Sequence, residues 1–193
     1  SYLTGGYEQI GSGLGIFGQR YNAAGDKVGV EFQINTTADQ WQEMSNVEAL
    51  TGGGFVVTWS TLGDDGTNYN IFGQRYDVAG AADGAEFQVN TTANDDQWVS
   101  TTAGLTDGGF VVTWTSNNQD GDGYGIYGQR YDAAGATAGA EFQINTYTAG
   151  DQQVADVTEL PNGEFLVTWT SNGQDGDSDG VYGQRFDAAG VAV

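Results

Sequence analysis

The chain has no cysteine, no histidine and almost no basic side chains. Its 193 residues contain 26 acidic and 5 basic residues, for a formal net charge of −21. Without thiols and imidazoles it has no cysteine nucleophile, no histidine base, no disulfide and no usual zinc or copper site. The acidic field repels nucleic acid and anionic lipid and attracts cations or basic partners. The sequence therefore argues against nucleic-acid binding and leaves oxygen-based groups as the source of any reactivity.

Long apolar runs are also missing. No stretch approaches the roughly 20 apolar residues of a membrane span, so we expect no membrane insertion. Ser1-Tyr2-Leu3 is neither a start methionine nor a secretion signal, so we expect a processed chain or an excerpt of a longer protein. The aromatic content, 12% of all residues, is too high for a disordered acidic tail and predicts a packed core.

The chain consists instead of a tandem repeat with a step of 55 residues. This step separates Arg20, Arg75, Arg130 and Arg185, and also Trp59, Trp114 and Trp169. Such self-similarity predicts units that bury their apolar faces against copies of themselves. We therefore expect one repeat domain over residues 1–193, with complete units at 56–110 and 111–165 and partial units at 1–55 and 166–193.

Each unit predicts four short strands and no helix. In the last units these are residues 157–160, 165–169 and 181–186, with 141–145 as the preceding fourth strand. Phe110, Val112 and Trp114 lie on one side of their strand and Val111 and Thr113 on the other, so both faces are largely apolar. The pattern predicts an all-β fold of tandem four-stranded antiparallel repeats, arranged as β-propeller-like blades. A flat solenoid is the alternative.

The first and last units do not hold a full set of four strands, so we expect incomplete terminal blades. Unpaired strand edges template pairing with another chain. We therefore expect a homo-oligomer, or neighbouring repeats, to complete these blades.

Loops between the second and third strands are rich in aspartate and glycine. The candidate metal ligands are Asp175, Asp177 and Asp179 in the last copy, Asp120 and Asp122 in the third, and Asp65 in the second. Acids at alternate positions followed by glycine begin an oxygen cage for calcium. Phe186 stands where an EF-hand has its bidentate glutamate, so another group has to complete the shell. The competing interpretation is that Asp-Gly pairs only form hairpin turns.

The repeated arginines have two interpretations. An arginine fork can recognise the carboxylate of a sugar acid. Alternatively, each arginine forms an internal ion pair with the glutamate eleven residues later, the partners being Glu31, Glu86 and Glu141. Identical copies favour a structural brace, because a binding cluster needs different residues that converge on one point.

Two tryptophans lie outside the repeat. Trp41 and Trp98 each follow an acid and a glutamine in a loop, and the next copy has Gln153 in this region. An exposed tryptophan beside polar groups can stack on a sugar, so both are candidate glycan ligands. The alternative is that each caps a blade.

Four motifs between Gly108 and Thr146 carry a family resemblance: Gly-Gly-Phe-Val-Val-Thr-Trp, Gln-Asp-Gly-Asp-Gly, Ile-Tyr-Gly-Gln-Arg-Tyr-Asp-Ala-Ala-Gly and Glu-Phe-Gln-Ile-Asn-Thr. They resemble the repeats of large calcium-rich, RTX-type, type I-secreted adhesins of Gram-negative bacteria. The resemblance implies an extracellular or cell-surface location, calcium loading after export, and an adhesive or scaffolding role. The nonapeptide Gly-Gly-x-Gly-x-Asp is absent from the sequence, so its metal sites are not implied. The strand order also resembles sialidase-type propellers, whose catalytic residues find no matching positions in this sequence.

Three functional hypotheses follow. The first is a non-catalytic, extracellular, calcium-stabilised β-repeat module for adhesion or self-associating structural assembly, and therefore not an enzyme. The second is a lectin-like propeller that binds carbohydrate through Trp41 and Trp98. The third is a glycosidase built on two carboxylates, which predicts a pocket with two acids facing one another.

Overall fold

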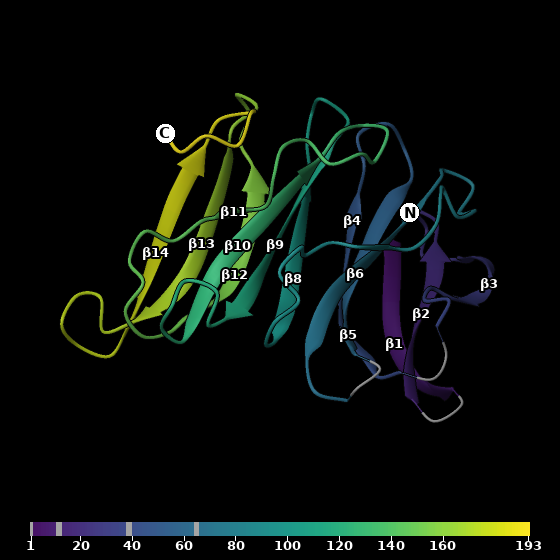
Figure 1. Ribbon diagram of the computed structural model, residues 1–193. Helices are drawn as coiled ribbons and strands as arrows, with labels where there is room; N and C mark the ends of the chain where they lie inside the picture. Colours follow the sequence, from purple (N-terminus) through teal and green to yellow (C-terminus); the bar gives the residue numbers. More distant parts are fainter. Residues whose placement is uncertain (1, 11–12, 38–39, 64–65) are drawn as a thin grey trace.

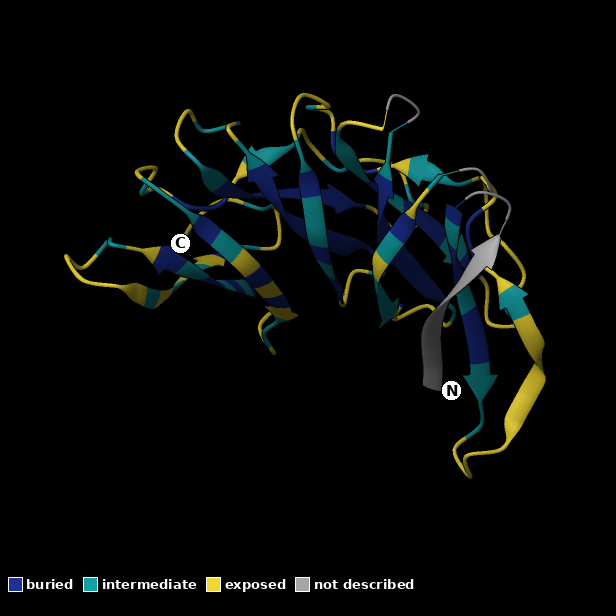
Figure 2. Ribbon diagram, turned by 90° about the horizontal axis from the view of Figure 1, so that it is seen from below, coloured by how far each residue is buried: buried dark blue, intermediate teal, exposed yellow. Residues whose placement is uncertain are grey.

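The computed structural model describes residues 2–10, 13–37, 40–63 and 66–193, the first of these segments through its backbone alone. These residues form 14 strands in four antiparallel sheets, which follow one another along an open arc (Figures 1 and 2). Among them there is no helix long and apolar enough to cross a bilayer.

We call the four sheets blades 1 to 4. Blade 1 contains β1 (Tyr2–Ile10), β2 (Gly13–Tyr21) and β3 (Lys27–Gln33). Blade 2 contains β4 (Gln42–Ala49), β5 (Phe55–Leu62), β6 (Tyr69–Tyr76) and β7 (Phe87–Gln88). Blade 3 contains β8 (Gln97–Gly104), β9 (Phe110–Asn117), β10 (Tyr124–Tyr131) and β11 (Phe142–Gln143). Blade 4 contains β12 (Gln152–Glu159), β13 (Phe165–Asn172) and β14 (Asp179–Phe186).

This architecture confirms the predicted fold class. The sheets are antiparallel meanders, with four strands in blades 2 and 3 and three in each terminal blade. The first strands of blades 2, 3 and 4 contact one another from blade to blade, and we call β4, β8 and β12 the inner strands. Stacked four-stranded meanders with their first strands in contact are the arrangement of propeller blades.

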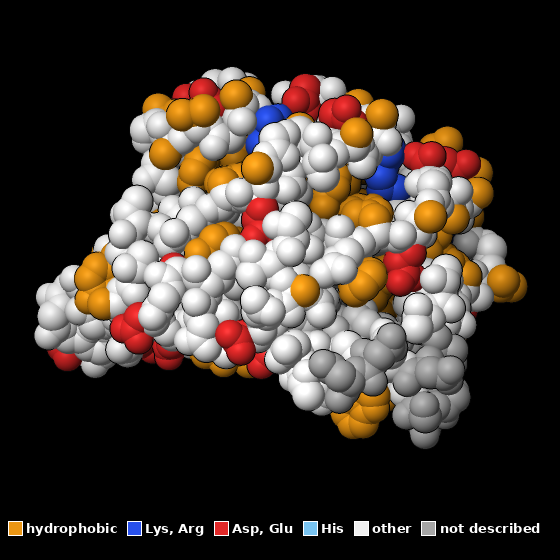
Figure 3. All heavy atoms as spheres, viewed as in Figure 1, with side chains coloured by type: hydrophobic (Ala, Val, Ile, Leu, Met, Phe, Trp, Pro, Cys, Tyr) orange, Lys and Arg blue, Asp and Glu red, His pale blue; other side chains and the backbone are white. Residues whose placement is uncertain are grey.

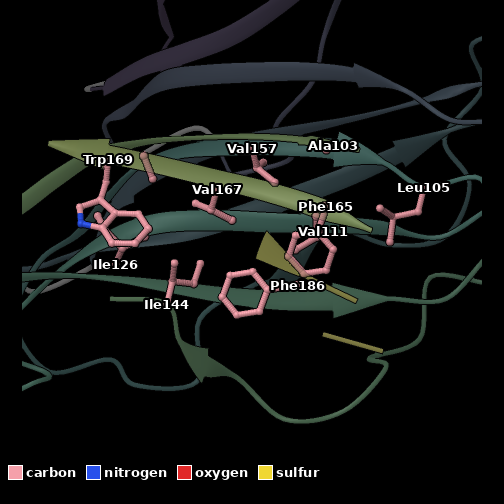
Figure 4. Close-up of a cluster of buried hydrophobic side chains, with 11 residues drawn as sticks. Ala103, Leu105, Val111, Ile126, Ile144, Val157, Phe165, Val167, Trp169 and Phe186 are labelled. Carbon is pink, nitrogen blue, oxygen red and sulfur yellow. The ribbon is translucent and has the colours of Figure 1, made fainter. Parts of the chain in front are cut away.

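The central blades are buried on both faces, as their sequences predict. Seven successive residues of β5 and of β9 are buried, whereas β13 in blade 4 alternates between buried and half-buried positions. Figure 4 shows the core between blades 3 and 4, where Val111 and Ile126 of blade 3 meet Val167, Phe165 and Trp169 of blade 4. A face that another blade covers is therefore apolar, and the two faces of one sheet belong to two different cores.

A repeated asparagine follows the last strand of blades 1, 2 and 3, which are β3, β7 and β11, and holds it to the neighbouring strand. The side-chain oxygens of Asn35, Asn90 and Asn145 accept hydrogen bonds of 2.7 Å from the backbone N–H groups of Ile16, Ile71 and Ile126. The Asn145 amide also donates to the Gln152 side chain at the start of the next inner strand. Because all these groups are buried, leaving one unpaired would cost free energy, and the asparagine recurs in the three units that contain this position.

Candidate functional site

The inner strands carry the side chains that break the repeat. Register places Glu43, Trp98 and Gln153 at equivalent positions, opposite Ser60, Thr115 and Thr170 of the second strands. By contrast, the second strands repeat a buried tryptophan in each of these blades. Packing identical blades together requires the same side chain at each equivalent position, and this position does not keep one. The inner strands are therefore where a site can be assembled.

Each inner strand has a β-bulge directly after this variable position. The bulges fall at Met44, Val99 and Val154, whose φ angles are 55°, 53° and 55°. A positive φ is unfavourable for non-glycine residues, and most unfavourable for β-branched valine. Bulges bend a strand and redirect its side chains. The same strained backbone conformation thus recurs in three blades, near the start of each inner strand.

The third strands place a second variable residue beside the first. Tyr69, Tyr124 and Asp179 begin β6, β10 and β14, at the same end of their blades as the start of the inner strands. We call this end the rim, and define it by the pairs Glu43 with Tyr69, Trp98 with Tyr124, and Gln153 with Asp179. In Figure 1 the rim is the lower end of the molecule, and Figure 3 shows acidic side chains along that edge.

The rim of blade 2 combines an acid with a phenol. The Tyr69 backbone N–H donates to Asp96 Oδ1 at 3.1 Å, which ties blade 2 to the loop before β8. Burial raises the pKa of Tyr69 to about 12, and the hydrogen bond to Glu43 and the charges of Glu43 and Asp96 add to this shift. A phenol held neutral beside two carboxylates is a hydrogen-bond donor that stays protonated over the physiological pH range.

The rim of blade 3 carries an aromatic pair. The rings of Trp98 and Tyr124 lie 5.9 Å apart at an interplanar angle of 31°. The Trp98 side chain is half-buried, and its indole Nε1 finds no hydrogen-bond acceptor among the described residues. The Tyr124 backbone N–H donates to Asp151 Oδ1 at 3.3 Å, the same link to the following blade that Tyr69 makes.

The rim of blade 4 has a hollow where blade 3 has its aromatic rings. Gln153 and Asp179 replace Trp98 and Tyr124 there, and a cavity of about 360 Å³ opens. It is lined by Asp151, Gln153, Val154, Thr170, Asn172 and Asp179. Asn172 Nδ2 donates to Asp179 Oδ1 at 2.9 Å. The hollow thus presents two carboxylates, two amides and a hydroxyl, and its volume falls in the range of small-ligand pockets.

This hollow lies on the face of blade 4 that points away from blade 3. Gln153 and Thr170 are paired across β12 and β13, and they alternate with Val157 and Val167, which pack against blade 3. In blade 3 the equivalent face is covered, because the Val154 backbone N–H of blade 4 contacts Thr115 Oγ1 at 3.3 Å. Of the two carboxylates of the hollow, Asp179 is exposed and Asp151 is half-buried.

The predicted calcium ligands lie at the same end of the molecule but do not converge. Asp177 Oδ1 accepts from the Ser178 backbone N–H, Asp179 is held by Asn172, and Asp122 Oδ2 accepts from the Gly150 backbone N–H. Asp120 and Asp175 each reach toward the glycine at the second position of the third strand, Gly125 and Gly180. Within the described segments no group of three or more acidic side chains could hold a metal ion. Asp65 lies outside the described residues, and calcium binding by these loops stays a prediction.

The repeated arginines lie at the opposite end and brace neighbouring blades. Arg20 donates to the backbone carbonyls of Val78 and Ala79 in the next blade, and Arg75 donates to that of Ala133 at 3.1 Å. The Asp-x-Ala-Gly turns that receive these side chains have room for them because they end in glycine. A Cβ on Gly135 would collide with Arg75 Nη1. The preferred structural interpretation of the arginines therefore agrees with their contacts.

The predicted partners of the arginines are wrong, however. The ion pairs are Arg75 with Asp83 at 3.0 Å, Arg130 with Asp107 at 3.5 Å and Arg185 with Glu164 at 3.3 Å. The glutamates brace the blades separately: Glu86 and Glu141 accept from the backbone and hydroxyl of Thr36 and Thr91 in the preceding blade. Glu31 lies exposed on β3. The hairpin between the third and fourth strands suggested that the arginine and the glutamate pair with each other. Instead, each of them contacts a neighbouring blade.

The two tryptophans proposed as glycan ligands occupy different structural positions. Trp98 is on an inner strand at the rim, whereas Trp41 precedes β4 at the position of Asp96 and Asp151. The Trp41 side chain is 50% exposed. Sequence reasoning missed Glu43, Tyr69, Tyr124, Asp151 and Asn172. The signal that could have found Glu43 was the difference between the copies at residues 43, 98 and 153, and the change from Tyr69 and Tyr124 to Asp179 marks the second rim position.

Comparison with known proteins supports the fold at low sequence identity. The sequence matches no protein-family model and no curated protein. Among solved structures, the chain is similar to an endo-arabinase of Bacteroides thetaiotaomicron, with 14% identity, a TM-score of 0.52, and coverage of 89% of this chain and 64% of that one. It is similar to an α-L-arabinofuranosidase of Fusarium graminearum in complex with an iminosugar inhibitor, at 15% identity and a TM-score of 0.55, covering 96% and 59%. It is also similar to an α-L-arabinanase of Penicillium chrysogenum complexed with arabinobiose, at 12% identity and a TM-score of 0.53, covering 93% and 57%.

These comparisons correct the first functional hypothesis. The prediction of a non-catalytic, calcium-binding structural module for adhesion, and with it the prediction that the chain is not an enzyme, is contradicted, because the three similar structures named above are arabinanases and an arabinofuranosidase. The identical residues of the repeat dominated the sequence argument, and the differences between the copies received less weight. The chain spans about three fifths of the length of these structures, with which it shares its fold.

Proposed function

We propose that this chain belongs to a glycoside-cleaving propeller that acts on a neutral, arabinose-containing polysaccharide outside the cell. The arabinanases and the arabinofuranosidase of similar fold support this substrate class. The resemblance of the repeats to exported proteins supports the location, and a polysaccharide is also too large to enter a cell uncut.

The observation that carries the proposal is the hollow at the rim of blade 4. It brings Asp151 and Asp179 to one cavity together with the amides of Gln153 and Asn172. Cleavage of a glycosidic bond needs one carboxyl group to protonate the leaving oxygen and a second to activate water or attack the sugar. Asp151 and Asp179 supply that pair, and the amides and Thr170 supply hydrogen bonds to sugar hydroxyls.

The charge of the chain indicates a neutral substrate. Acids outnumber bases by 26 to 5, and the arginines Arg20, Arg75 and Arg130 are bound to backbone carbonyls or acids at the end opposite the hollow. A polysaccharide of sugar acids would meet like charge at the rim without a cation to offset it. Arabinan carries no charge and avoids this repulsion.

Hydrolysis of a polysaccharide panel tests the proposal. The panel contains linear arabinan, branched arabinan, xylan and the charged polygalacturonate, and release of reducing ends is measured. We expect activity on arabinan, with Asp151→Asn and Asp179→Asn each lowering the rate by about 10²-fold or more, as expected for loss of an acid or base. Asp177→Asn is the matched control, because Asp177 lies in the loop directly before Asp179 without lining the hollow. Absence of hydrolysis of every neutral polysaccharide, or full activity of both variants, would refute the proposal.

A second candidate function is carbohydrate binding without cleavage, which the aromatic pair Trp98 and Tyr124 favours. Aromatic rings bind the apolar faces of sugars, and neither ring lines the hollow. Three results together would support this function instead: the wild-type protein binds arabinan, Trp98→Ala lowers the affinity, and no reducing ends are released.

A further inference from the structure

The three rim pairs differ in chemistry although they occupy equivalent positions. Glu43 and Tyr69 offer an acid and a phenol, Trp98 and Tyr124 two neighbouring rings tilted by 31°, and Gln153 and Asp179 an amide and an acid at a hollow. We propose that the rim binds an extended glycan chain across neighbouring blades, with Trp98 and Tyr124 as the stacking platform between two polar subsites. This inference rests on the proposed function only in taking a glycan as the ligand.

The three pairs lie at the same end of three neighbouring blades. β8 contacts β4 on one side and β12 on the other, and each pair stands where its inner strand begins. Two equivalent hydrogen bonds cross the junctions between the blades, from the Tyr69 N–H to Asp96 and from the Tyr124 N–H to Asp151, and each ends just before the next inner strand. The same bulge at Met44, Val99 and Val154 sets the orientation of each pair. A ligand that leaves one subsite along the rim therefore meets the next.

The spacing of the blades indicates a chain rather than a single sugar. Stacked sheets pack about 10 Å apart, which is farther than one sugar ring reaches. One monosaccharide can contact one pair only. Contact with the platform of blade 3 and the hollow of blade 4 at the same time needs at least two linked sugars, and contact with Glu43 needs a longer chain. Affinity should therefore rise with the number of sugars.

Packing alone does not account for the variation. Trp59, Trp114 and Trp169 are buried and identical in the three blades, as identical blade contacts require. A glutamate, a tryptophan and a glutamine share one position of the rim, with the glutamate and tryptophan both half-buried. If Trp98 only filled space beneath blade 4, its loss would lower stability and leave affinity for a glycan unchanged, and this is the outcome that separates the two explanations.

Titration of the folded wild-type chain with neutral arabino-oligosaccharides of two to eight sugars tests the inference. Binding is followed by tryptophan fluorescence and by calorimetry. We expect affinity to rise about tenfold from the disaccharide to the hexasaccharide, a gain that corresponds to about 1.4 kcal/mol. Trp98→Ala should remove most of this gain while it leaves disaccharide affinity in the hollow largely unchanged. Tyr21→Ala is the matched aromatic control, because Tyr21 is half-buried at the opposite end.

Each outcome decides between the alternatives. Affinity independent of chain length, or an equal loss for short and long chains in Trp98→Ala, overturns the inference. If Trp98→Ala does not fold, Trp98→Leu and Tyr124→Ala replace it and are judged in the same way. Length-dependent binding without any hydrolysis refutes the proposed enzyme and supports the extended site. Hydrolysis of arabinan without dependence on chain length supports the enzyme and refutes the extended site.

Discussion

The two ends of the blades differ in how strictly the repeat is kept. At the arginine end, the residues Arg20, Arg75 and Arg130 make contacts with the turn of the next blade that are nearly the same each time. At the rim, the equivalent positions carry Glu43, Trp98 and Gln153. The braces need one geometry at every junction, whereas a ligand site needs different groups in chosen places. The comparison indicates that the arginine end holds the blades together, and it agrees with our proposal of a ligand site at the rim.

The largest expected contrast is between two tryptophans of blade 3. Trp114 is completely buried between blades 2 and 3, so Trp114→Ala leaves a cavity and should lower the free energy of unfolding by about 3–5 kcal/mol. Trp98→Ala at the rim should cost clearly less, because its side chain is only half-buried. Denaturant unfolding of both variants measures the difference. Equal losses would mean that the rim tryptophan belongs to the core.

The next contrast is between two copies of the repeated arginine. Arg75 has a side chain that is 15% exposed and holds Ala133 of the next blade and Asp83, so Arg75→Ala should lower the free energy of unfolding by about 1–3 kcal/mol. The Arg185 side chain is 53% exposed and pairs with Glu164, so Arg185→Ala should change stability by less than about 0.5 kcal/mol. Thermal unfolding of both variants checks this order. A reversed order would remove the bracing role from the buried arginines.

A smaller effect is expected from the buried phenol of Tyr76. Burial, and after it the charge of Glu86, raises the pKa of Tyr76 from 10.0 to about 12. A raised folded pKa means that the neutral phenol stabilises the fold below pH 10, and that this contribution is lost as pH rises from about 10 to 12. The free energy of unfolding of Tyr76→Phe should therefore fall less with rising pH in this window than that of the wild type. At neutral pH, loss of the hydrogen bond from Tyr76 to the Ile34 carbonyl should lower it by about 1 kcal/mol. Unfolding free energies at several alkaline pH values measure the slope, and an unchanged slope would contradict the assignment.

The smallest effect concerns the rim phenol. Glu43 contributes a hydrogen bond and a charge to the raised pKa of Tyr69, so Glu43→Gln should lower that pKa toward 10.0 and leave Tyr76 unchanged. Absorbance titration of the tyrosinates, with Tyr69→Phe to assign the signal, follows both groups. If the variant moved the Tyr76 titration as well, the rim and the core would be electrostatically coupled, and the separation of the two ends would be weaker than the contacts indicate.

Much of the fold could be predicted from the sequence because each blade repeats the same pattern of strands and turns. Alternation in Phe110 to Trp114 predicted a sheet buried on both faces, and the recurring arginine and tryptophan predicted stacked copies. The partners of the arginines could not be predicted in this way, because Arg75 reaches Ala133, which is 58 residues away. A period in the sequence shows which residues are equivalent and does not show which of them meet between blades.

The candidate site was less predictable for the same reason. The sequence singled out Trp98, Asp179 and Gln153 separately, as a sugar ligand, a metal ligand and a difference between copies. Only the register of β12 with β13, and of β13 with β14, brings Gln153 and Asp179 to one hollow with Asp151.

The sequence by itself determined an acidic, all-β chain of stacked repeats, because strand alternation and the 55-residue step are properties of the chain's own order. The tertiary structure alone decided which variable residues stand side by side. Strand pairing and blade stacking collect onto one rim side chains that lie 26 or 55 residues apart in the chain, such as Trp98 with Tyr124 and Trp98 with Gln153.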